Sequence, residues 1–281
     1  MTLPPAWQAL ASRLKELPAW SRHSMEWTAS TGSTNDDLKT GWKSSPARHR
    51  LRIAGHQTAG RGQRGRVWTA APGAGLLFSF SWRWENADAA WEIPLRAGLA
   101  VHAACRPFVR DPSRLWLKWP NDLCLGEGKL GGILVESTLQ EGALSLIVGV
   151  GINLRRPEAV IDGGDGPAMP AAAIADEISH QGEALPAAVL EKFVVQWNDQ
   201  MSSAPWTARQ LVAAYEQAAA PFLGRCIRIL GGDGMCLVGR VSGFTENGAL
   251  VILDENGGQR RISDARRVLL ADGITGPSPE S

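Results

Sequence analysis

The sequence predicts an α/β (α+β) fold up to about residue 220, followed by a small antiparallel β-barrel. Two observations support this prediction. Before residue 220, apolar segments with helical spacing alternate with short apolar runs between turn residues, as in helices that pack on a sheet. After Pro221, short apolar runs follow one another between glycine-rich turns, which is typical of a small barrel. Of the 281 residues, 44% are hydrophobic and 20% are charged, so a core of ordinary size can form.

The N-terminal part of the chain predicts two helices and two strands. Apolar residues recur at spacings of three and four, as on one helical face: Trp7, Leu10, Leu14 and Leu17. The segment 24–30 (SMEWTAS) has the composition of a short strand, and 51–56 (LRIAGH) predicts a second one. Between them, Ser33 or Thr34 can cap a helix over residues 35–42.

The middle of the chain predicts a long loop, a buried helix and a series of strands. Residues 58–75 contain five glycines and three arginines with no helical or strand period, so they predict a loop. Residues 90–109 predict a long buried helix. Apolar runs between turn residues predict the strands 75–84, 114–120, 123–125, 129–138 and 144–154.

The C-terminal part predicts helices and then the barrel. Helical spacing predicts helices over 171–180, 187–199 and 207–219. The barrel strands are expected at 225–230, 236–244, 249–255 and 259–264. We therefore expect a first domain at 1–220, an SH3-like barrel at 221–272 and a disordered tail at 273–281.

Composition excludes several functional classes. The chain has 29 basic and 28 acidic residues, a formal net charge of +1, which argues against bulk attraction to nucleic acid or to anionic lipid. The four cysteines form no C-x-x-C pair and the five histidines are scattered, so we expect no structural zinc site. The N-terminus lacks a continuous apolar segment, and no run of about 18 apolar residues occurs. We expect a soluble, cytoplasmic protein without a membrane span.

The segment Gly60–Arg66 (GRGQRGR) is the first candidate for chemistry. Its glycines allow backbone N–H groups to face an anion, and its arginines fit phosphate or carboxylate. Trp68 offers an apolar surface close by. The alternative is a disordered arginine–glycine segment that binds RNA. A phosphate-binding loop of the G-x-x-x-x-G-K-[ST] type does not occur in the chain.

Two further segments carry lysines beside turns. In Lys118-Trp119-Pro120-Asn121-Asp122 a strand ends in a lysine that could meet a phosphate, and Asn121 and Asp122 could hold Mg²⁺ or a lysine amine. The alternative is an ordinary Asx turn. In KLGGILVE, Lys129 precedes Gly131 and Gly132, which would let a ligand approach. The alternative is a lysine in a hairpin turn.

Two short polar motifs complete the set. Ser33-Thr34-Asn35 caps a helix and could also bind a small polar ring through free donors at the helix N-terminus. The segment 149–154 (GVGINL) presents Asn153 at a glycine-rich strand end, or is only a kinked strand.

Taken together and in this order, these motifs resemble the biotin–protein ligase family. The family's motifs STN, Q-x-A-G-R-G-x-R-G-R-x-W, KWPND, KLGGILVE and G-x-G-I-N all occur. The resemblance covers residues 24–154 closely and the barrel loosely. It implies a mixed-sheet catalytic domain with a C-terminal SH3-like barrel. It also implies an ATP-dependent ligase that forms biotinoyl-AMP and transfers biotin to a lysine of a biotin carboxyl carrier protein domain.

The resemblance assigns roles to individual residues. The expected biotin-binding residues are Ser33, Thr34, Asn35, Gln57, Arg61, Gly62, Gln63, Lys129, Gly131 and Gly132. The expected ATP-binding residues are Arg64, Arg66, Trp68, Lys118, Asn121 and Asn153. The expected catalytic residues are Lys129, Arg61, Lys118 and Asp122. Mg²⁺ is expected to arrive with ATP, and no protein ligand is assigned to it.

The chain departs from the family pattern in two places. The family's loop commonly carries arginine where this chain has Gln63, so retention of the adenylate is in question. Bifunctional members carry a winged helix of about 60 residues before the STN motif, whereas 32 residues precede Ser33. We therefore expect no DNA binding. The resemblance suggests a monomer or a homodimer.

Two alternatives to this function remain open. A lipoate or octanoate ligase would need a long apolar tunnel, which the polar residues Ser33, Asn35 and Gln57 argue against. A non-enzymatic RNA-binding module would be built on the arginine–glycine loop (Gly60–Arg66) and the barrel. The near-zero net charge argues against this alternative.

Overall fold

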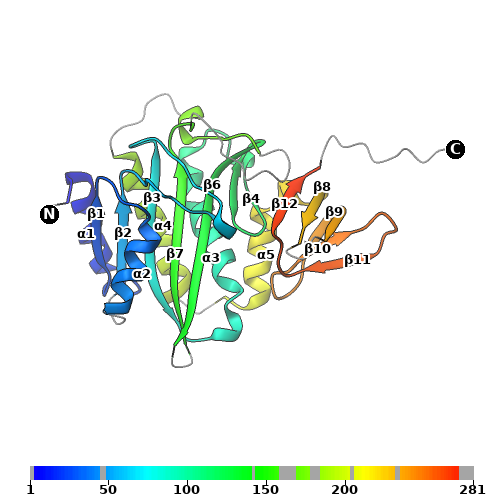
Figure 1. The fold of residues 1–281 in the computed structure, drawn as a ribbon, viewed down its shortest axis with the longest axis horizontal. Coiled ribbons are helices and arrows are strands. Elements are labelled where there is room, and N and C mark those ends of the chain that lie inside the picture. The colour runs from blue at the N-terminus through cyan, green and yellow to red at the C-terminus, as the bar shows by residue number, and fades with distance from the viewer. Residues whose placement is uncertain are drawn as a thin grey trace.

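A seven-stranded mixed sheet forms the centre of the molecule (Figure 1). The computed structural model describes residues 3–44, 49–140, 143–157, 169–177, 184–202, 206–231 and 235–271. The strand order is β1-β2-β3-β7-β6-β5-β4, with β1 parallel to β2 and the other neighbours antiparallel. The strands are β1 (Ser24–Thr28), β2 (Arg50–Ala54), β3 (Gly75–Trp84), β4 (Leu115–Lys118), β5 (Asp122–Leu125), β6 (Gly128–Gln140) and β7 (Ala143–Asn153). The mixed-sheet prediction is confirmed.

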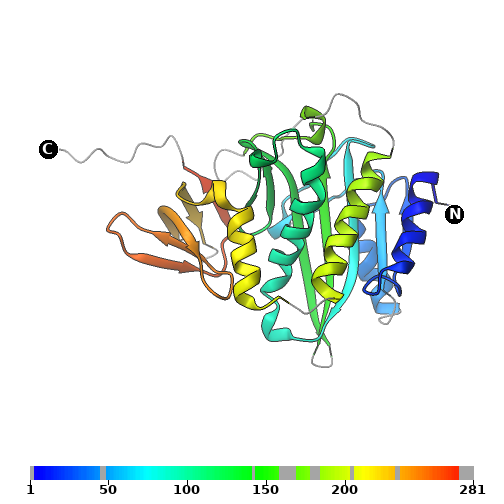
Figure 2. The same cartoon turned by 180° about the vertical axis from the view of Figure 1, so that it is seen from behind.

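Helices cover both faces of this sheet. Four of them lie on one face (Figure 2): α1 (Pro5–Glu16), α3 (Glu92–Cys105), α4 (Leu185–Ser202) and α5 (Ala208–Ala218). The helix α2 (Thr34–Ser44) lies on the other face against β2, β3 and β7 (Figure 1). Short 3₁₀ helices connect the elements at Gln63–Gly65, Ala87–Ala89, Arg106–Phe108, Pro112–Arg114, Ile174–Asp176 and Ala220–Phe222.

The core lies between the sheet and the four-helix layer. Trp7, Leu10 and Leu14 of α1 are buried, as their spacing predicts. The strand β7 is buried along its whole length, and β3 is buried over Gly75–Ser81. A strand that is covered on both faces has a near-continuous apolar sequence, which explains the runs GLLFSF and LIVGVGI. The motifs singled out above therefore lie on the central strands or directly beside them.

The C-terminal part is a five-stranded antiparallel sheet that packs beside α5 (Figure 1). Its strands are β8 (Cys226–Leu230), β9 (Cys236–Phe244), β10 (Leu250–Leu253), β11 (Gln259–Ile262) and β12 (Arg267–Leu270). The order is β11-β10-β9-β8-β12, and no ladder joins β11 to β12 in the described part of the chain. A small β domain is thus present, but the barrel is not closed. The strand β12 was not predicted, because its four residues follow Asp264 without a turn signal.

Two predicted helices differ from those observed. The helix expected over 171–180 is absent from its described part, where Ala171 pairs with Lys129 and a 3₁₀ turn follows at Ile174–Asp176. The backbone of Lys129 bonds to Pro170 and Ala172 at 2.7 and 2.9 Å, so strand-like pairing displaces the helix. Residues 178–180 lie outside the described residues, as does the expected disordered tail. The helix expected over 90–109 is shorter, since α3 ends before Pro107.

Contacts hold the two sheets together. The guanidinium of Arg225 forms two bonds with Glu127, at 2.7 and 2.8 Å, in the turn between β5 and β6. The indole Nε1 of Trp119 donates to the backbone oxygen of Gly248 at 3.1 Å. The C-terminal sheet is therefore fixed beside the ends of β4, β5 and β6, where the lysine motifs lie.

Candidate active site

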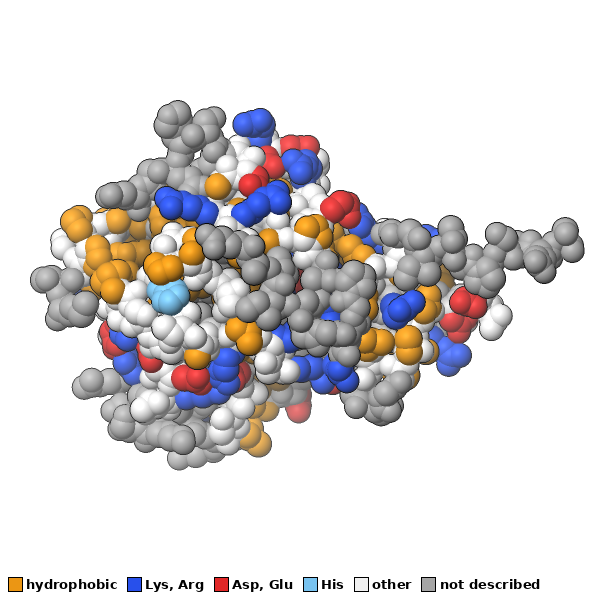
Figure 3. Space-filling model, turned by 45° about the horizontal axis from the view of Figure 1, so that its top comes forward, with side chains coloured by type: hydrophobic (Ala, Val, Ile, Leu, Met, Phe, Trp, Pro, Cys, Tyr) orange, Lys and Arg blue, Asp and Glu red, His pale blue; other side chains and the backbone are white. Residues whose placement is uncertain are grey.

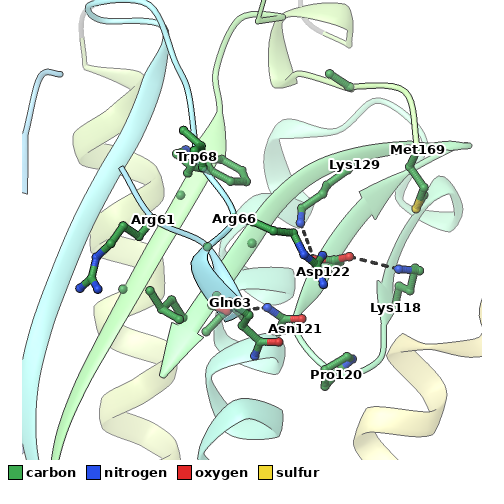
Figure 4. A pocket seen from close by; sticks show the side chains of 18 of the residues that line it. Arg61, Gln63, Arg66, Trp68, Lys118, Pro120, Asn121, Asp122, Lys129 and Met169 are labelled. Atoms are coloured by element: carbon green, nitrogen blue, oxygen red, sulfur yellow. Dashed lines mark hydrogen bonds and ion pairs between the residues drawn. The ribbon is translucent and has the colours of Figure 1, made fainter. Parts of the chain in front are cut away.

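A cavity of about 380 Å³ opens where the strand ends meet the arginine–glycine loop (Figure 4). Its walls come from the N-terminus of α2, from the loop after β2, from β4 to β7 and from the segment around β12. The size falls within the range of small-molecule sites, which is about 300–1,000 Å³. Most of the residues predicted for the site line this cavity: Ser33, Asn35, Gln57, Arg61, Gly62, Gln63, Arg66, Trp68, Lys118, Asn121, Asp122, Lys129, Gly132 and Asn153.

Two lysines share one carboxylate on the floor of the cavity. Asp122 Oδ1 lies 2.5 Å from Lys129 Nζ, and its Oδ2 lies 3.2 Å from Lys118 Nζ (Figure 4). Burial on its own would raise the pKa of Asp122, but the charges of Lys129 and Lys118 outweigh burial and hold that pKa well below its usual range. The carboxylate is therefore ionised, and the three groups carry a net positive charge that suits an anionic ligand.

Trp68 lies across two glycines of the sheet. A Cβ atom at Gly151 would lie 2.6 Å from Trp68 Cε2, and one at Gly132 would lie 3.3 Å from Trp68 Cζ3. Gly132 and Gly151 are paired neighbours on β6 and β7. The glycines thus allow the indole to approach the sheet. Lys129 Nζ lies 5.7 Å from the centre of the Trp68 ring, within cation–π distance.

Ser33, Thr34 and Asn35 form a buried polar wall with Gln57. Their exposed fractions are 4%, 3% and 3%. Gln57 Oε1 accepts from the backbone N–H of Thr34 at 2.7 Å and lies 3.0 Å from the Thr34 hydroxyl oxygen. Because Thr34 bonds to Gln57 and to Ser79, it stands behind the cavity and holds the residues that line it.

The arginines of the loop are held in three different ways. Arg61 pairs with Asp36 at 2.5 Å and with Glu136 at 3.3 Å, and its side chain points away from the lysines (Figure 4). Arg64, whose φ of 57° is left-handed, pairs with Asp264. Arg66 donates to the backbone oxygen of Arg266 at 2.6 Å. The loop is thus attached both to α2 and to the C-terminal sheet.

Two buried donors at the cavity have no partner among the described residues, namely Arg61 Nε and Trp68 Nε1. A buried donor without an acceptor costs about 1–3 kcal/mol, so acceptor atoms of a ligand would stabilise this arrangement. Asn121 and Asn153 differ, since their amides donate to backbone oxygens of Ile133, Lys129 and Ala172. The described residues contain no group of three metal-ligating side chains.

Comparison with known proteins identifies the part of the chain that contains this site. Residues 27–153 match the model of the Biotin/lipoate A/B protein ligase family. The matched segment includes the polar wall, the arginine–glycine loop, both lysines and Trp68, so most of the residues that define the cavity lie in the part of the chain that resembles this family.

Two curated relatives are named biotin ligases. The chain is 43% identical over 117 residues to the bifunctional ligase/repressor BirA of Escherichia coli (strain K12), an alignment that covers 40% of this chain and 36% of that protein. It is 38% identical over 138 residues to the biotin–[acetyl-CoA-carboxylase] ligase of Mycobacterium tuberculosis, covering 48% of this chain and 50% of that protein. The matches thus span half or less of the length of these relatives.

A solved structure is similar to this chain well beyond residues 27–153. The biotin protein ligase from Aquifex aeolicus in complex with biotin and ATP is 26% identical, with a TM-score of 0.68. The superposition covers 88% of this chain and 99% of that chain. The shared architecture therefore extends well beyond residues 27–153.

Three of the residues predicted for the site do not line the cavity. Thr34 supports Gln57, Gly131 packs against the backbone of Gly151, and Arg64 pairs with Asp264. Conversely, Ser79 and Glu136 bond to the polar wall but were not predicted as site residues. Glu136 ends the motif KLGGILVE, so the sequence contained a signal for it. Ser79 and Ser81 both lie in the buried part of β3, and only the place of Ser79 beside Asn35 identifies it.

Proposed function

We propose that the protein is a biotin–protein ligase. It activates biotin with ATP as biotinoyl-AMP and transfers the biotinoyl group to a lysine of a biotin carboxyl carrier protein domain. Three similarities support this proposal. Residues 27–153 match the biotin/lipoate ligase family, the curated relatives are named biotin ligases, and the fold resembles the Aquifex aeolicus ligase in complex with biotin and ATP.

One observation carries the proposal. A single cavity joins a wall of neutral polar groups to a pair of lysines, with Trp68 between them. A ureido ring offers one carbonyl and two N–H groups, which neutral side chains such as Ser33, Asn35 and Gln57 can satisfy. The lysines suit the carboxylate at the other end of biotin and the phosphates of ATP.

In the first step, a carboxylate oxygen of biotin attacks the α-phosphorus of ATP, and pyrophosphate leaves with the bond electrons. Negative charge develops on the phosphate oxygens, and fixed cations stabilise it most strongly in a site that excludes water. Lys129 and Lys118 fill this role, since Asp122 holds both ammonium groups toward the same space. Arg66 and Gln63 line the cavity beside them.

In the second step, a neutral lysine amine of the acceptor attacks the acyl carbon of biotinoyl-AMP. The acyl C–O bond breaks, AMP leaves with its electrons, and the new amide nitrogen releases one proton to solvent. Asp122 could orient that amine or deprotonate it. Because its pKa lies well below the usual range, the carboxylate is a weak base. This favours the orienting role, in which Asp122 accepts hydrogen bonds from ammonium and amine groups.

Mg²⁺ enters the proposal as the ion that accompanies ATP. Asp122 already serves two lysines, and the described residues offer no cluster of three metal-ligating side chains. We therefore assign no protein ligand to the ion. Asn121, Asn153 and Asp122 supply the oxygen atoms at the cavity that are nearest in kind to magnesium ligands.

The two alternative functions have less support. A lipoate ligase needs an apolar tunnel, whereas Ser33, Asn35 and Gln57 make one end of this cavity polar. For an RNA-binding module, a continuous basic surface is expected. On the face in Figure 3, basic and acidic side chains are interspersed, in line with the net charge of +1.

Exchange of labelled pyrophosphate into ATP tests the activation step. We expect exchange that depends on biotin and Mg²⁺ and that does not occur when lipoate or octanoate replaces biotin. Exchange with lipoate but not with biotin would favour the alternative ligase, and no exchange with any acid would contradict the proposal.

A further inference from the structure

Glu136 on β6 receives three side chains at once. Its Oε1 accepts from Lys39 Nζ at 2.6 Å, and its Oε2 accepts from Asn35 Nδ2 at 2.8 Å. Arg61 lies at 3.3 and 3.4 Å from the two oxygens. Asn35 and Arg61 line the cavity, whereas Glu136 stands behind them. The carboxylate is therefore in contact with two residues that face a ligand, but not with the ligand itself.

A continuous chain of hydrogen bonds runs from Glu136 through the polar wall. Asn35 Nδ2 donates to the carboxylate, so its Oδ1 is left as an acceptor, and Ser79 Oγ donates to it at 2.5 Å. Ser79 Oγ and Thr34 Oγ1 lie 2.6 Å apart. Each hydroxyl has one proton, and that of Ser79 is used on Asn35. The Thr34 hydroxyl must then be the donor in its bond to Ser79.

Gln57 joins this chain through the backbone of Thr34. Its Oε1 accepts the backbone N–H of Thr34 at 2.7 Å. With the oxygen used in this way, Nε2 is the part of the Gln57 amide that is left for a ligand, and two N–H donors match a carbonyl oxygen. An ionised carboxylate can only accept hydrogen bonds. Glu136 therefore sets the direction of each bond between itself and Ser79.

The surroundings keep Glu136 ionised. Burial on its own would raise the pKa of this carboxyl, but hydrogen bonds from Lys39 and Asn35 and the charge of Arg61 outweigh burial and lower that pKa. Lys39 and Arg61 come from α2 and from the arginine–glycine loop, so the same carboxylate also ties these two segments to β6.

We propose that Glu136 is a positioning residue for the biotin ureido ring, acting through Asn35 and Ser79 on the polar wall and through Arg61 on the loop. This inference rests on the proposed function, since it names the part of biotin that the wall recognises. Glu136→Gln keeps the shape of the side chain but loses its charge and its acceptor-only character. The amide of Asn35 then has no fixed direction.

Calorimetric titration with biotin, without ATP, tests the inference. We expect Glu136→Gln to raise the Kd for biotin at least about tenfold, the scale of one hydrogen bond to a charged group. In the pyrophosphate exchange assay at saturating biotin, kcat should stay within about threefold of wild type, because Lys118 and Lys129 are unchanged. Glu26→Gln is the matched control: Glu26 also pairs with two arginines on the same sheet but has no contact with the polar wall. It should leave the Kd unchanged.

A second variant covers the case in which Glu136→Gln fails to fold. Ser79→Ala removes the hydroxyl that links Asn35 to Thr34 in this chain of hydrogen bonds. It should also raise the Kd for biotin. In the double variant the two effects should not add, since they break one chain. An unchanged Kd in either folded variant, or a loss in kcat alone, would overturn the inference. Failure of wild type to bind biotin would instead contradict the proposed function.

Discussion

Lys129 connects the groups on which the proposed chemistry depends. Its Nζ contacts Asp122 at 2.5 Å and lies over the Trp68 ring, and its backbone pairs with the segment around Ala171. The side chain is held on two sides, so its charge has a defined place relative to the cavity. Preorganised charge of this kind stabilises a transition state without further rearrangement.

Lys129→Ala should lower the rate of biotin-dependent pyrophosphate release by about 10²–10³-fold. Folding should change little, because Asp122 keeps its contact with Lys118. The measurement is a pre-steady-state assay of pyrophosphate, with the exposed Lys192→Ala on α4 as the control. A rate within about threefold of wild type would show that this charge does not assist the step.

Gln63 lies at the start of a 3₁₀ turn and lines the cavity. The neighbouring arginines cannot readily replace a missing charge here, since Arg64 pairs with Asp264 and Arg66 bonds to the backbone of Arg266. A charge-assisted hydrogen bond is about twice as strong as a neutral one. We therefore expect the wild type to release biotinoyl-AMP readily and to label bystander lysines.

Gln63→Arg should slow the release of radiolabelled biotinoyl-AMP about tenfold, which corresponds to about 1.4 kcal/mol. Labelling of bystander lysines should fall in parallel. Equal release rates for wild type and Gln63→Arg would show that charge at this position does not matter.

At the scale of elements, β6 and β7 bring the site together. Lys129, Gly132 and Glu136 lie along β6, and Gly149 and Gly151 lie along β7. The glycines leave room on this face for Asn35 and Trp68, since a Cβ atom at Gly149 would meet the amide of Asn35. The two strands therefore determine which side chains can reach the cavity.

Gly151→Ala should lower biotin affinity at least about tenfold. The added methyl would lie 2.6 Å from Trp68 Cε2, so the indole must move away from the sheet. Calorimetric titration with biotin measures the effect. Gly32→Ala serves as the control, because a Cβ atom there meets nothing within 4 Å. If both variants bind biotin alike, Trp68 does not form a wall of the binding site.

The sequence predicted the elements best where a period or a motif was strong. The bounds of β3 agree with the apolar run 75–84, and the buried face of α1 follows from Trp7, Leu10 and Leu14. The helix predicted over 171–180 was wrong in its described part, residues 171–177, because the pairing partner of that segment, Lys129, is distant in sequence. The motifs also predicted both lysines but not that they pair with the same carboxylate, Asp122. That contact exists only because β5 pairs with β4 on one side and with β6 on the other.

At the scale of the whole molecule, the C-terminal sheet is part of the site. Residues from Ala265 to Leu270 line the cavity, and Asp264 and Arg266 hold the arginine–glycine loop. No helix among the described residues is both long and apolar enough to cross a membrane. Near the other end of the sheet, a cluster of aromatic rings surrounds His23, whose ring stacks on Trp82 with centroids 5.4 Å apart.

Stability should fall in mild acid because of this cluster. Burial lowers the pKa of His23 from 6.5 to about 3, and it also lowers the pKa values of His49 and His102. As the pH falls below 6.5, the unfolded chain binds a proton at His23 before the folded chain does. The stabilisation is therefore complete above pH 6.5 and is lost progressively toward pH 3. His23 alone should lower the free energy of unfolding by about 2 kcal/mol between about pH 7.5 and about pH 5.

Urea unfolding at several pH values measures this loss, and His23→Gln should reduce its slope. Asp122 does not contribute in this window, since the stability that its lowered pKa provides is lost only as the pH falls below 3.8. A wild-type stability that does not change between pH 7.5 and pH 5 would contradict the assignment of a buried, neutral His23.

We propose that one cavity both activates biotin and passes it to a protein lysine. The most direct test is to incubate the protein with ATP, Mg²⁺, biotin and a biotin carboxyl carrier protein domain, and to measure the intact mass of that domain. We expect the mass to rise by one biotinoyl group, with no rise when ATP is left out or when the acceptor lysine is replaced by arginine. An unchanged carrier mass in the complete reaction would contradict the account.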